Sequence, residues 1–250
     1  MGYRKKVVFQ NLRNSFPEKS EKEIKLIGKL FYRYLCDLIL ETLKTISMNK
    51  KEMNKRCIIK NISLLKKLYA EKKNIILVMG HYGNWEWGGA AFSLQTDYSL
   101  FVIYRPLSNK YFDHLLYKMR TAFGTQLIEM NHTFKEMIRN KQNTNATAFI
   151  ADQTPPPDHA HWTTFLNQKT PVFKGTELIA KKLNYPIVFI NIKRMKRGYY
   201  EVYPEMLVEN PALTGEGEIT ELHTKKLEKE IINQPELWLW SHRRWKHKKN

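Results

Sequence analysis

Residues 74–87, NIILVMGHYGNWEW, decide the fold class of this chain. A continuous run of large aliphatic residues stops at Gly80, and a helical pattern begins near Trp85. A short apolar run that ends at a glycine and leads into a helix is typical of a strand buried on both faces of a sheet. The stretch therefore predicts a strand over 74–79 followed by a helix over 85–94.

The same alternation continues along the rest of the chain. Strands alternating with helices indicate a sheet that is covered by helices on both faces. We expect one α/β domain with a mixed, largely parallel central sheet flanked by helices. The further strands are predicted at 99–104, 146–151, 186–192 and 199–204, and the further helices at 108–123, 132–141, 174–183 and 216–233.

Residues 1–70 are predicted to form a helical, basic extension packed on the α/β core of residues 71–250. Its clearest helix spans 20–48, where apolar residues recur every three or four positions and Ser20 and Glu23 form a capping box. This helix either faces the core with a solvated basic side or contacts a membrane surface. The basic side carries Lys22, Lys25, Lys29 and Arg33.

The charge of the chain predicts an anionic partner. The 250 residues carry a net charge of +18, with 15 Lys or Arg against 6 Asp or Glu in residues 1–60. Hydrophobic residues make up 42% and charged residues 26%, which excludes the class of intrinsically disordered chains. Nucleic acid, a phospholipid surface, an acidic carrier protein and a phosphorylated substrate would all suit this charge, and charge alone does not choose among them.

His81 and Glu86 are the candidate catalytic pair of the opening stretch. Their spacing alone says little, because 8 histidines and 24 acidic residues produce it by chance, and it recurs at His223 and Glu228. The second pair lies in a helical pattern, where residues five apart point away from each other. Around His81 the flanking glycines instead permit a sharp turn at the carboxyl end of a strand, where ligands bind in α/β sheets, so that Glu86 can reach back to the imidazole.

An imidazole in contact with a carboxylate can deprotonate a hydroxyl. An unperturbed imidazole accepts a proton near neutral pH, and a carboxylate bound to its other nitrogen fixes the tautomer. The chain has no GxSxG motif, and neither Cys36 nor Cys57 lies in a glycine-rich turn, so no convincing nucleophile for an acyl-enzyme is present. We therefore expect direct group transfer to a hydroxyl of a bound substrate.

Several stretches together resemble the bacterial lipid A biosynthesis acyltransferases, which are members of the wider lysophospholipid acyltransferase superfamily. One His-x4-acid motif is weak, but an ordered set of this kind is highly specific and spans essentially the whole chain. The stretches are GYRKKVVFQNLRNSFPEKSEKEI (2–24), GHYGNWEW (80–87), YRPLSNKYFD (104–113), ADQ (151–153), FLNQKTPVFKGTELIAKKLNYPIVF (165–189) and LWLWSHRRWKH (237–247).

The resemblance implies an activity and a role for each residue of the pair. In that family the histidine is the general base and the acidic residue orients it, which corresponds to His81 and Glu86 here. The family transfers a fatty acyl chain from acyl carrier protein to a hydroxyl of a lipid A precursor, generally on an acyl chain already attached. The resemblance implies neither a metal nor a tightly bound cofactor.

Four other positions are predicted by the resemblance to bind substrate. Arg105 and Arg120 resemble arginines near the active cleft that suit phosphate on the acceptor or the carrier. Asp152 and Gln153 resemble the acidic block that follows the base, and they either position acceptor hydroxyls or cap a loop. A turn into the next helix is predicted for Thr170, Pro171 and Gly175. Candidates for the wall of an acyl pocket, which would equally suit the core, are Trp85, Trp87, Phe92, Phe101 and Phe165.

The resemblance also predicts a location and partners. Family members normally carry a hydrophobic anchoring segment ahead of the GYRKKV stretch, and this chain begins there. We expect either a missing N-terminal anchor or peripheral binding through the basic helix at the cytoplasmic face of the bacterial inner membrane. The expected partners are acyl carrier protein, the lipid A precursor and anionic membrane lipid, which contributes roughly 1 kcal/mol per nearby Lys or Arg.

Three other interpretations remain open at the level of sequence. The same pair would serve transfer to another membrane lipid, such as a lysophospholipid or an amino-acid lipid. The stretch DHAHW (158–162) puts two histidines near Asp152, as in a hydrolase metal site. The charge and the aromatic residue in RRWKHKK would suit a non-enzymatic nucleic-acid-binding protein, but no recognised motif supports it and we expect no nucleic-acid partner.

Overall fold

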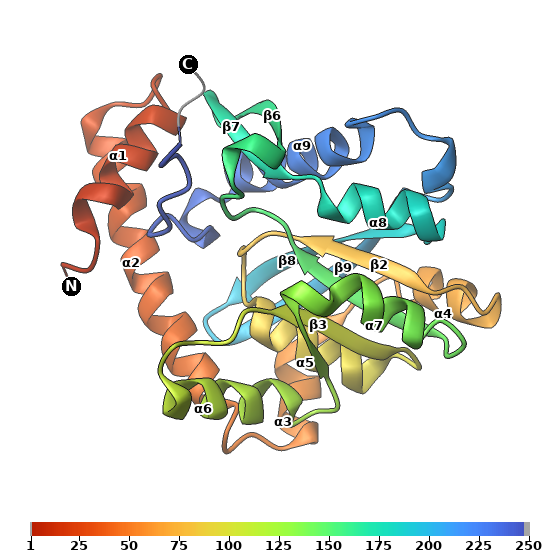
Figure 1. Ribbon diagram of the computed structural model, residues 1–250. Coiled ribbons are helices and arrows are strands. Elements are labelled where there is room, and N and C mark those ends of the chain that lie inside the picture. The colour runs from red at the N-terminus through yellow and green to blue at the C-terminus, as the bar shows by residue number, and fades with distance from the viewer. Residues whose placement is uncertain (1, 248–250) are drawn as a thin grey trace.

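A seven-stranded sheet forms the centre of the computed structural model, which describes residues 2–247 (Figure 1). All neighbouring strands run parallel except β8 and β9, which are antiparallel. The predicted α/β fold with a mixed, largely parallel sheet is therefore confirmed. In spatial order the strands are β1 (Cys57–Ile59), β9 (Tyr199–Val208), β8 (Ile187–Lys196), β2 (Ile75–Met79), β5 (Asn145–Ile150), β3 (Ser99–Tyr104) and β4 (Gln126–Glu129).

Strand β2 lies between β8 and β5 and is apolar at every position. Ile76 and Val78 belong to one apolar core together with side chains of α8 and α9, and Ile75 and Leu77 belong to a second core with side chains of α4 and α5. Successive strand residues point to opposite faces, so a strand with helices on both sides needs apolar residues without alternation. The continuous apolar run in the sequence is explained by this double cover.

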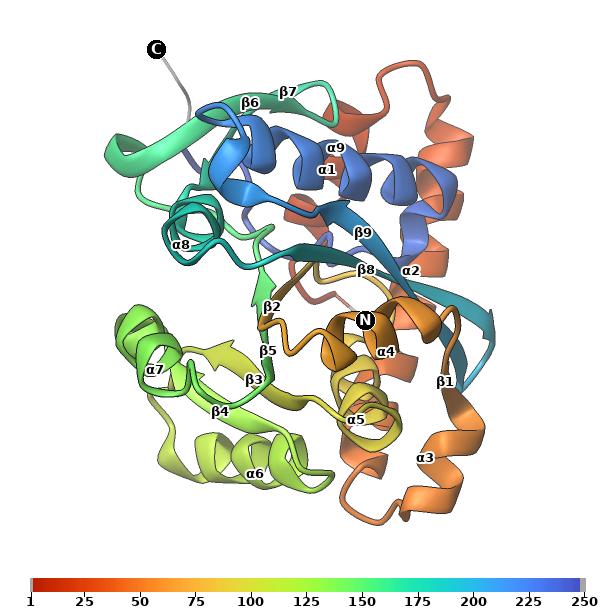
Figure 2. The same cartoon turned by 90° about the vertical axis from the view of Figure 1, so that its right-hand side faces the viewer.

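The helices form layers on both faces of the sheet. In Figures 1 and 2, α8 and α9 lie above the sheet and α3 and α5 below it, while α2 runs down one side of the molecule past both layers. The helices are α1 (Lys5–Ser15), α2 (Glu21–Lys44), α3 (Lys50–Arg56), α4 (Ser63–Ala70), α5 (Trp85–Gln95), α6 (Lys110–Thr121), α7 (Thr133–Arg139), α8 (Gly175–Leu183) and α9 (Glu218–Asn233). Short 3₁₀ turns lie at Met130–His132, Pro157–His159, Pro211–Leu213 and Pro235–Leu237.

Helix α2 begins as the sequence predicts. The Ser20 hydroxyl accepts a hydrogen bond from the Glu23 N–H, and the Glu23 carboxylate accepts one from the Ser20 N–H, which completes the capping box. The apolar stripe of α2 is buried from Ile24 to Leu38, and the four basic side chains of the opposite face are exposed. The helix ends at Lys44, four residues earlier than predicted, and Ile46 is exposed beyond it.

Several elements were not predicted. Strand β1 lies within the segment expected to be a helical extension and pairs with β9, so residues 1–70 supply one edge of the sheet. A separate hairpin consists of β6 (Ala160–Phe165) and β7 (Gln168–Phe173), joined by Leu166 and Asn167, both with positive φ as in a type I′ turn. The prediction of a turn at Thr170 and Pro171 was wrong, because both lie in β7 and only Gly175 begins a helix. Helices α1, α3 and α4 lie in the segment expected to be helical, although their bounds were not predicted, and β4 was not predicted at all.

No helix within residues 2–247 combines the length and the hydropathy that a membrane crossing requires.

Candidate active site

His81 lies just beyond the carboxyl end of β2, in the loop that leads into α5. Position 83 requires a glycine, and Gly80 is closely packed against a leucine side chain. A Cβ on Gly80 would lie 2.6 Å from Leu227, and a Cβ on Gly83, whose φ is +62°, would lie 2.8 Å from the Ile192 carbonyl oxygen. The sharp backbone path predicted from these two glycines is therefore present.

The same loop is held by a segment from the far end of the chain. The Gly83 N–H donates to the Leu237 carbonyl at 3.1 Å, and the Leu239 N–H donates to the His81 carbonyl at 3.2 Å. Tyr82 and Trp238 form an antiparallel bridge between these bonds. The residues after α9 thus pair with the loop of residues 80–84, called the motif loop below, and fix its backbone. No local pattern in the sequence indicates this pairing.

The imidazole of His81 is bound by Asp152, which follows β5. The Nδ1 atom of His81 lies 2.6 Å from Asp152 Oδ1, while Oδ2 accepts the His81 backbone N–H and the Trp238 indole N–H, each at 2.8 Å. Burial by itself raises the pKa of Asp152, but the His81 charge and these hydrogen bonds lower it to about 2. An ionised carboxylate only accepts hydrogen bonds, so Nδ1 carries the proton and Nε2 is left as a base.

The Nε2 side of His81 is lined by Gln153 and Trp85. The Gln153 amide nitrogen lies 3.3 Å from His81 Nε2, and the Trp85 ring meets the imidazole edge to face, with 5.0 Å between centroids. The His81 side chain is 17% exposed, whereas that of Asp152 is 4% exposed. The base is therefore reachable while its carboxylate partner is shielded from water.

Glu86 forms no hydrogen bond with His81 within residues 2–247. Its carboxylate receives hydrogen bonds from Arg120 of α6, from Nη2 at 2.6 Å and from Nε at 3.0 Å. The predicted bond from Glu86 to the imidazole was wrong, because in the part of the chain that the structure describes the ring contacts Asp152 instead. Glu86 lies in the first turn of α5 and faces α6, so the carboxylate that reaches the ring comes from the neighbouring strand.

Helix α5 is anchored from beneath by a buried polar network. Asn84 caps the helix by accepting the Trp87 N–H at 3.0 Å, and its amide donates to Glu41 of α2 at 2.7 Å. The hydroxyl of Tyr200 donates to the same Glu41 oxygen at 2.7 Å. Burial raises the pKa of Glu41, and the bonds from Tyr200 and Asn84 oppose that rise only in part. This network fixes the position of α5 relative to α2 and β9.

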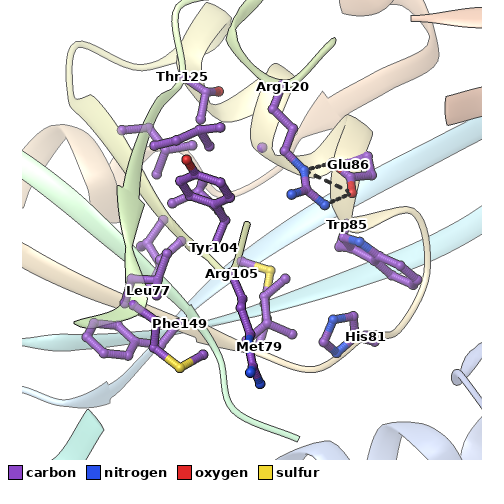
Figure 3. A pocket seen from close by; sticks show the side chains of 18 of the residues that line it. Leu77, Met79, His81, Trp85, Glu86, Tyr104, Arg105, Arg120, Thr125 and Phe149 are labelled. Atoms are coloured by element: carbon purple, nitrogen blue, oxygen red, sulfur yellow. Dashed lines mark hydrogen bonds and ion pairs between the residues drawn. The ribbon is translucent and has the colours of Figure 1, made fainter. Parts of the chain in front are cut away.

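A cavity of about 750 Å³ extends from His81 between α5 and the sheet, a volume within the usual range for ligand pockets. In Figure 3, His81, Trp85 and Glu86 follow one another along one side of the pocket, and Leu77 and Phe149 lie across from them. Gly88 and Gly89 of α5 line this space, and a Cβ on Gly88 would lie 2.8 Å from the Ile192 side chain, which packs closely against the helix there. Other apolar residues that line it include Met79, Phe92, Leu100, Val102 and Ala148.

The other predicted residues divide into two groups. Arg105, which is exposed, and Arg120 line the pocket together with Trp85 and Phe92. Away from this pocket, Trp87 and Phe165 are buried in the two apolar cores. Phe101 is also buried, on β3.

The remaining histidines of the sequence analysis belong to other surroundings. His161 pairs with Glu221 at 2.7 Å, and His159 is exposed. Among the described residues no group of three or more His, Cys, Asp or Glu side chains is arranged to hold a metal ion. As predicted, His223 and Glu228 do not meet, because Glu228 bonds Leu166 and Lys225 while His223 is buried elsewhere.

A family model and two known proteins match almost the whole chain. A family model described as bacterial lipid A biosynthesis acyltransferase matches residues 1–247. The chain is 24% identical over 249 residues to the lipid A biosynthesis palmitoleoyltransferase of Escherichia coli (strain K12), which covers 97% of this chain and 79% of that protein. A lipid A biosynthesis acyltransferase of Shigella flexneri matches with the same identity and coverage.

Proposed function

This chain belongs to the family of bacterial lipid A biosynthesis acyltransferases, and on that premise we propose that it transfers a fatty acyl chain from acyl carrier protein to a hydroxyl of a lipid A precursor. The observation that carries the proposal is the position of His81. Its imidazole, backed by the buried Asp152 carboxylate, lies at one end of a largely apolar cavity of about 750 Å³. A base beside such a cavity suits a reaction between an acyl chain and a hydroxyl.

The chemistry proceeds by direct transfer. The Nε2 atom of His81 takes the proton of the acceptor hydroxyl while that oxygen attacks the thioester carbonyl carbon of the donor. Asp152 keeps its negative charge and stabilises the imidazolium. The C–S bond then breaks, and the leaving thiolate receives the proton from His81, which yields an ester, a free carrier thiol and the neutral imidazole.

The remaining residues bind and position the substrates. Arg105, exposed and without a hydrogen-bond or ion-pair partner in residues 2–247, is available to bind a phosphate. Glu86 holds Arg120 at the pocket wall, so its contribution passes through the arginine. Gln153 is near enough to Nε2 to hold the acceptor hydroxyl beside the base.

The surface of the N-terminal helices supports a peripheral contact with anionic lipid at the cytoplasmic face of the inner membrane. The exposed face of α2 is basic in its first half and apolar in its second half, where Leu40 is 58% and Leu43 is 47% exposed. On α6, beside the pocket, Tyr111 is 90% and Phe112 is 61% exposed. Apolar side chains next to basic ones are the combination that binds the interface of an anionic bilayer.

The direct test is an acyl transfer assay with the purified protein in detergent. Acyl-acyl carrier protein and a tetra- or penta-acylated lipid A precursor should give a product heavier by one acyl group in mass spectrometry. His81→Ala should lower the rate roughly 10²-fold or more. His159→Ala, which removes an exposed histidine away from the pocket, is the matched control and should leave the rate unchanged.

Three outcomes separate the parts of the proposal. Near wild-type activity in His81→Ala would refute the base. Equal rates with acyl-coenzyme A would refute dependence on the carrier protein. Transfer to a lysophospholipid or an amino-acid lipid, but not to the lipid A precursor, would replace the acceptor and keep the chemistry.

A further inference from the structure

A second, much smaller cavity touches Asp152 deep in the molecule. Its volume is about 10 Å³, close to what one water molecule needs. Four polar residues line it, namely Asp152, His223 and Thr224 of α9, and Arg244 of the segment that follows α9. The rest of its wall is mainly apolar and includes Val78, Phe165, Val172, Phe189 and Leu227.

Arg244 is the unusual member of this group. It is 2% exposed, and its Nε and Nη1 atoms have no hydrogen-bond partner among the described residues. No carboxylate in residues 2–247 forms an ion pair with it either. A buried guanidinium without partners is costly, and proteins almost always satisfy such groups with protein atoms or ordered water.

His223 shows the same pattern across the cavity. Its side chain is 4% exposed, and its Nε2 atom has no partner within the described part of the chain. Burial lowers the pKa of His223 to about 4, so the ring is neutral near pH 7 and Nε2 can accept a hydrogen bond. The cavity is therefore lined by two residues with unpartnered nitrogens, Nε and Nη1 of Arg244 and Nε2 of His223, and Thr224 also lines it.

We propose that one water molecule is bound between Arg244 and His223, and that Arg244 is a positioning residue for the His81–Asp152 pair. Three polar partners are the usual number for a buried water. The water oxygen accepts from Nε and Nη1, and one of its hydrogens is donated to His223. The positioning role rests on the proposed function, which assigns the His81–Asp152 pair to catalysis, whereas the water site does not depend on it.

The charge of Arg244 acts on Asp152 through the protein interior. Burial lowers the pKa of Arg244 to about 10, which leaves the group charged near pH 7, and the interaction with Asp152 opposes that lowering. A fixed buried cation favours the ionised form of a nearby carboxylate and disfavours a proton on the dyad. Arg244 therefore keeps the pair in the form that accepts a proton from the substrate.

The other titratable groups near the pair add little positive charge. Burial lowers the pKa of His242 to about 4, as it does for His223, so both imidazoles are neutral near pH 7. Among the described residues, Arg244 is thus the cation that lines the small cavity beside Asp152. The groups that face Asp152, His223 or His242 from the surrounding elements are His81, His161, Glu177, Glu221, Arg4 and Arg244.

The water is tested by a crystal structure of the wild-type protein at a resolution that shows ordered solvent. The expected result is a density peak within hydrogen-bonding distance of Arg244 Nε or Nη1 and of His223 Nε2. A dry cavity, or an Arg244 side chain paired with a carboxylate, would overturn the water site. This measurement needs no substrate, so its outcome is separate from that of the proposed acyl transfer.

The positioning role is tested by the pH dependence of kcat/KM in Arg244→Met and Arg244→Lys. Loss of the cation in Arg244→Met should move the acid limb of the profile to higher pH by about 0.5 to 1 unit, because the dyad then takes up a proton more readily. Arg244→Lys keeps the charge and should restore the wild-type limb. An unshifted limb in Arg244→Met, or equal shifts in both variants, would show that Arg244 only packs.

Discussion

Asp152 and Glu41 are two buried carboxylates that serve the same loop from different sides, yet their surroundings move their pKa values in opposite directions. Asp152 accepts two hydrogen bonds from His81 and one from Trp238, and its pKa falls to about 2. Glu41 accepts from the neutral groups of Tyr200 and Asn84, and burial raises its pKa. The donor set, more than the depth of burial, decides whether a carboxylate stays charged.

The difference assigns separate tasks to the two regions. Behind His81, a carboxylate is held in its charged form, and in the proposed mechanism it fixes a tautomer and stabilises a developing imidazolium. Beneath α5, a carboxylate bound by neutral donors joins helix to helix and has no contact with the pocket. The same change from carboxylate to amide should therefore lower activity at Asp152 much more than at Glu41, and the two carboxylates should differ in how they affect stability as the pH changes.

The largest expected effect is on catalysis by Asp152→Asn. An amide in this place favours the wrong tautomer of His81 and leaves the imidazolium without its counter-charge, so kcat should fall by about 10³-fold or more. Glu41→Gln is the matched change of a carboxylate to an amide and should leave kcat within about threefold. Acyl transfer rates of both purified variants test this, and similar losses in the two would refute the division of tasks.

A smaller loss is expected at Glu86. If this residue acts only through Arg120, Glu86→Gln should lower kcat/KM by about 10- to 100-fold, as a misplaced charged group in a pocket wall does. The double variant Glu86→Gln with Arg120→Met should then be no worse than Arg120→Met alone. A loss in Glu86→Gln as large as that of Asp152→Asn, with additive effects in the double variant, would return Glu86 to the catalytic pair.

The next test concerns membrane binding by the exposed face of α2, the helix that carries Glu41. Leu40→Glu with Leu43→Glu should weaken binding to vesicles of anionic phospholipid roughly tenfold, because charged side chains replace apolar ones at the proposed interface. Leu213→Glu, at a leucine that is 85% exposed in another turn, is the control. Vesicle co-sedimentation measures both variants, and equal binding by all forms would remove α2 from the membrane contact.

The smallest effect is the pH dependence of stability. A carboxyl with a raised folded-state pKa, as at Glu41, stabilises below its unfolded pKa, and this contribution is lost as pH rises through the folded value. Asp152 behaves in the opposite way: its contribution, on the order of 2 kcal/mol, is present above pH 3.8 and is lost as pH falls toward 2.

Glu41→Gln should therefore gain Tm relative to the wild type as pH rises from about 4.5 to 8, by at most about 2–4 °C. Calorimetry at several pH values provides the measurement. If the Tm of Glu41→Gln does not rise relative to that of the wild type toward high pH, ionisation of Glu41 does not destabilise the folded protein.

The sequence predicts those parts of the fold whose signal is local. The apolar run of β2 and the capping box of α2 depend on nearby residues, and both lie where expected. Strand β1 has three residues, and it is a strand only because β9 pairs with it. The β6–β7 hairpin mixes polar and apolar side chains along both strands, which gives neither a strand period nor a continuous apolar run.

The candidate site is predictable only in part for the same reason. His81 and Asp152 each follow a buried strand. In a parallel sheet this predicts that both lie at the same edge. That β5 and β8, rather than β3, flank β2 is a choice of topology, and this choice brings Asp152 to the imidazole. Trp238 and Arg244 come from a segment whose local pattern predicts no contact with the loop.

The bond between the motif loop and residues 237–239 has a consequence for the order of events during synthesis. All seven strands of the central sheet leave the ribosome before Trp238 does, so a nascent chain can complete its sheet while the loop around His81 lacks its backbone partners. Until this segment docks, neither the indole that bonds Asp152 nor the buried guanidinium is in place. The surroundings of His81 are therefore completed last, after every strand of the central sheet has been synthesised.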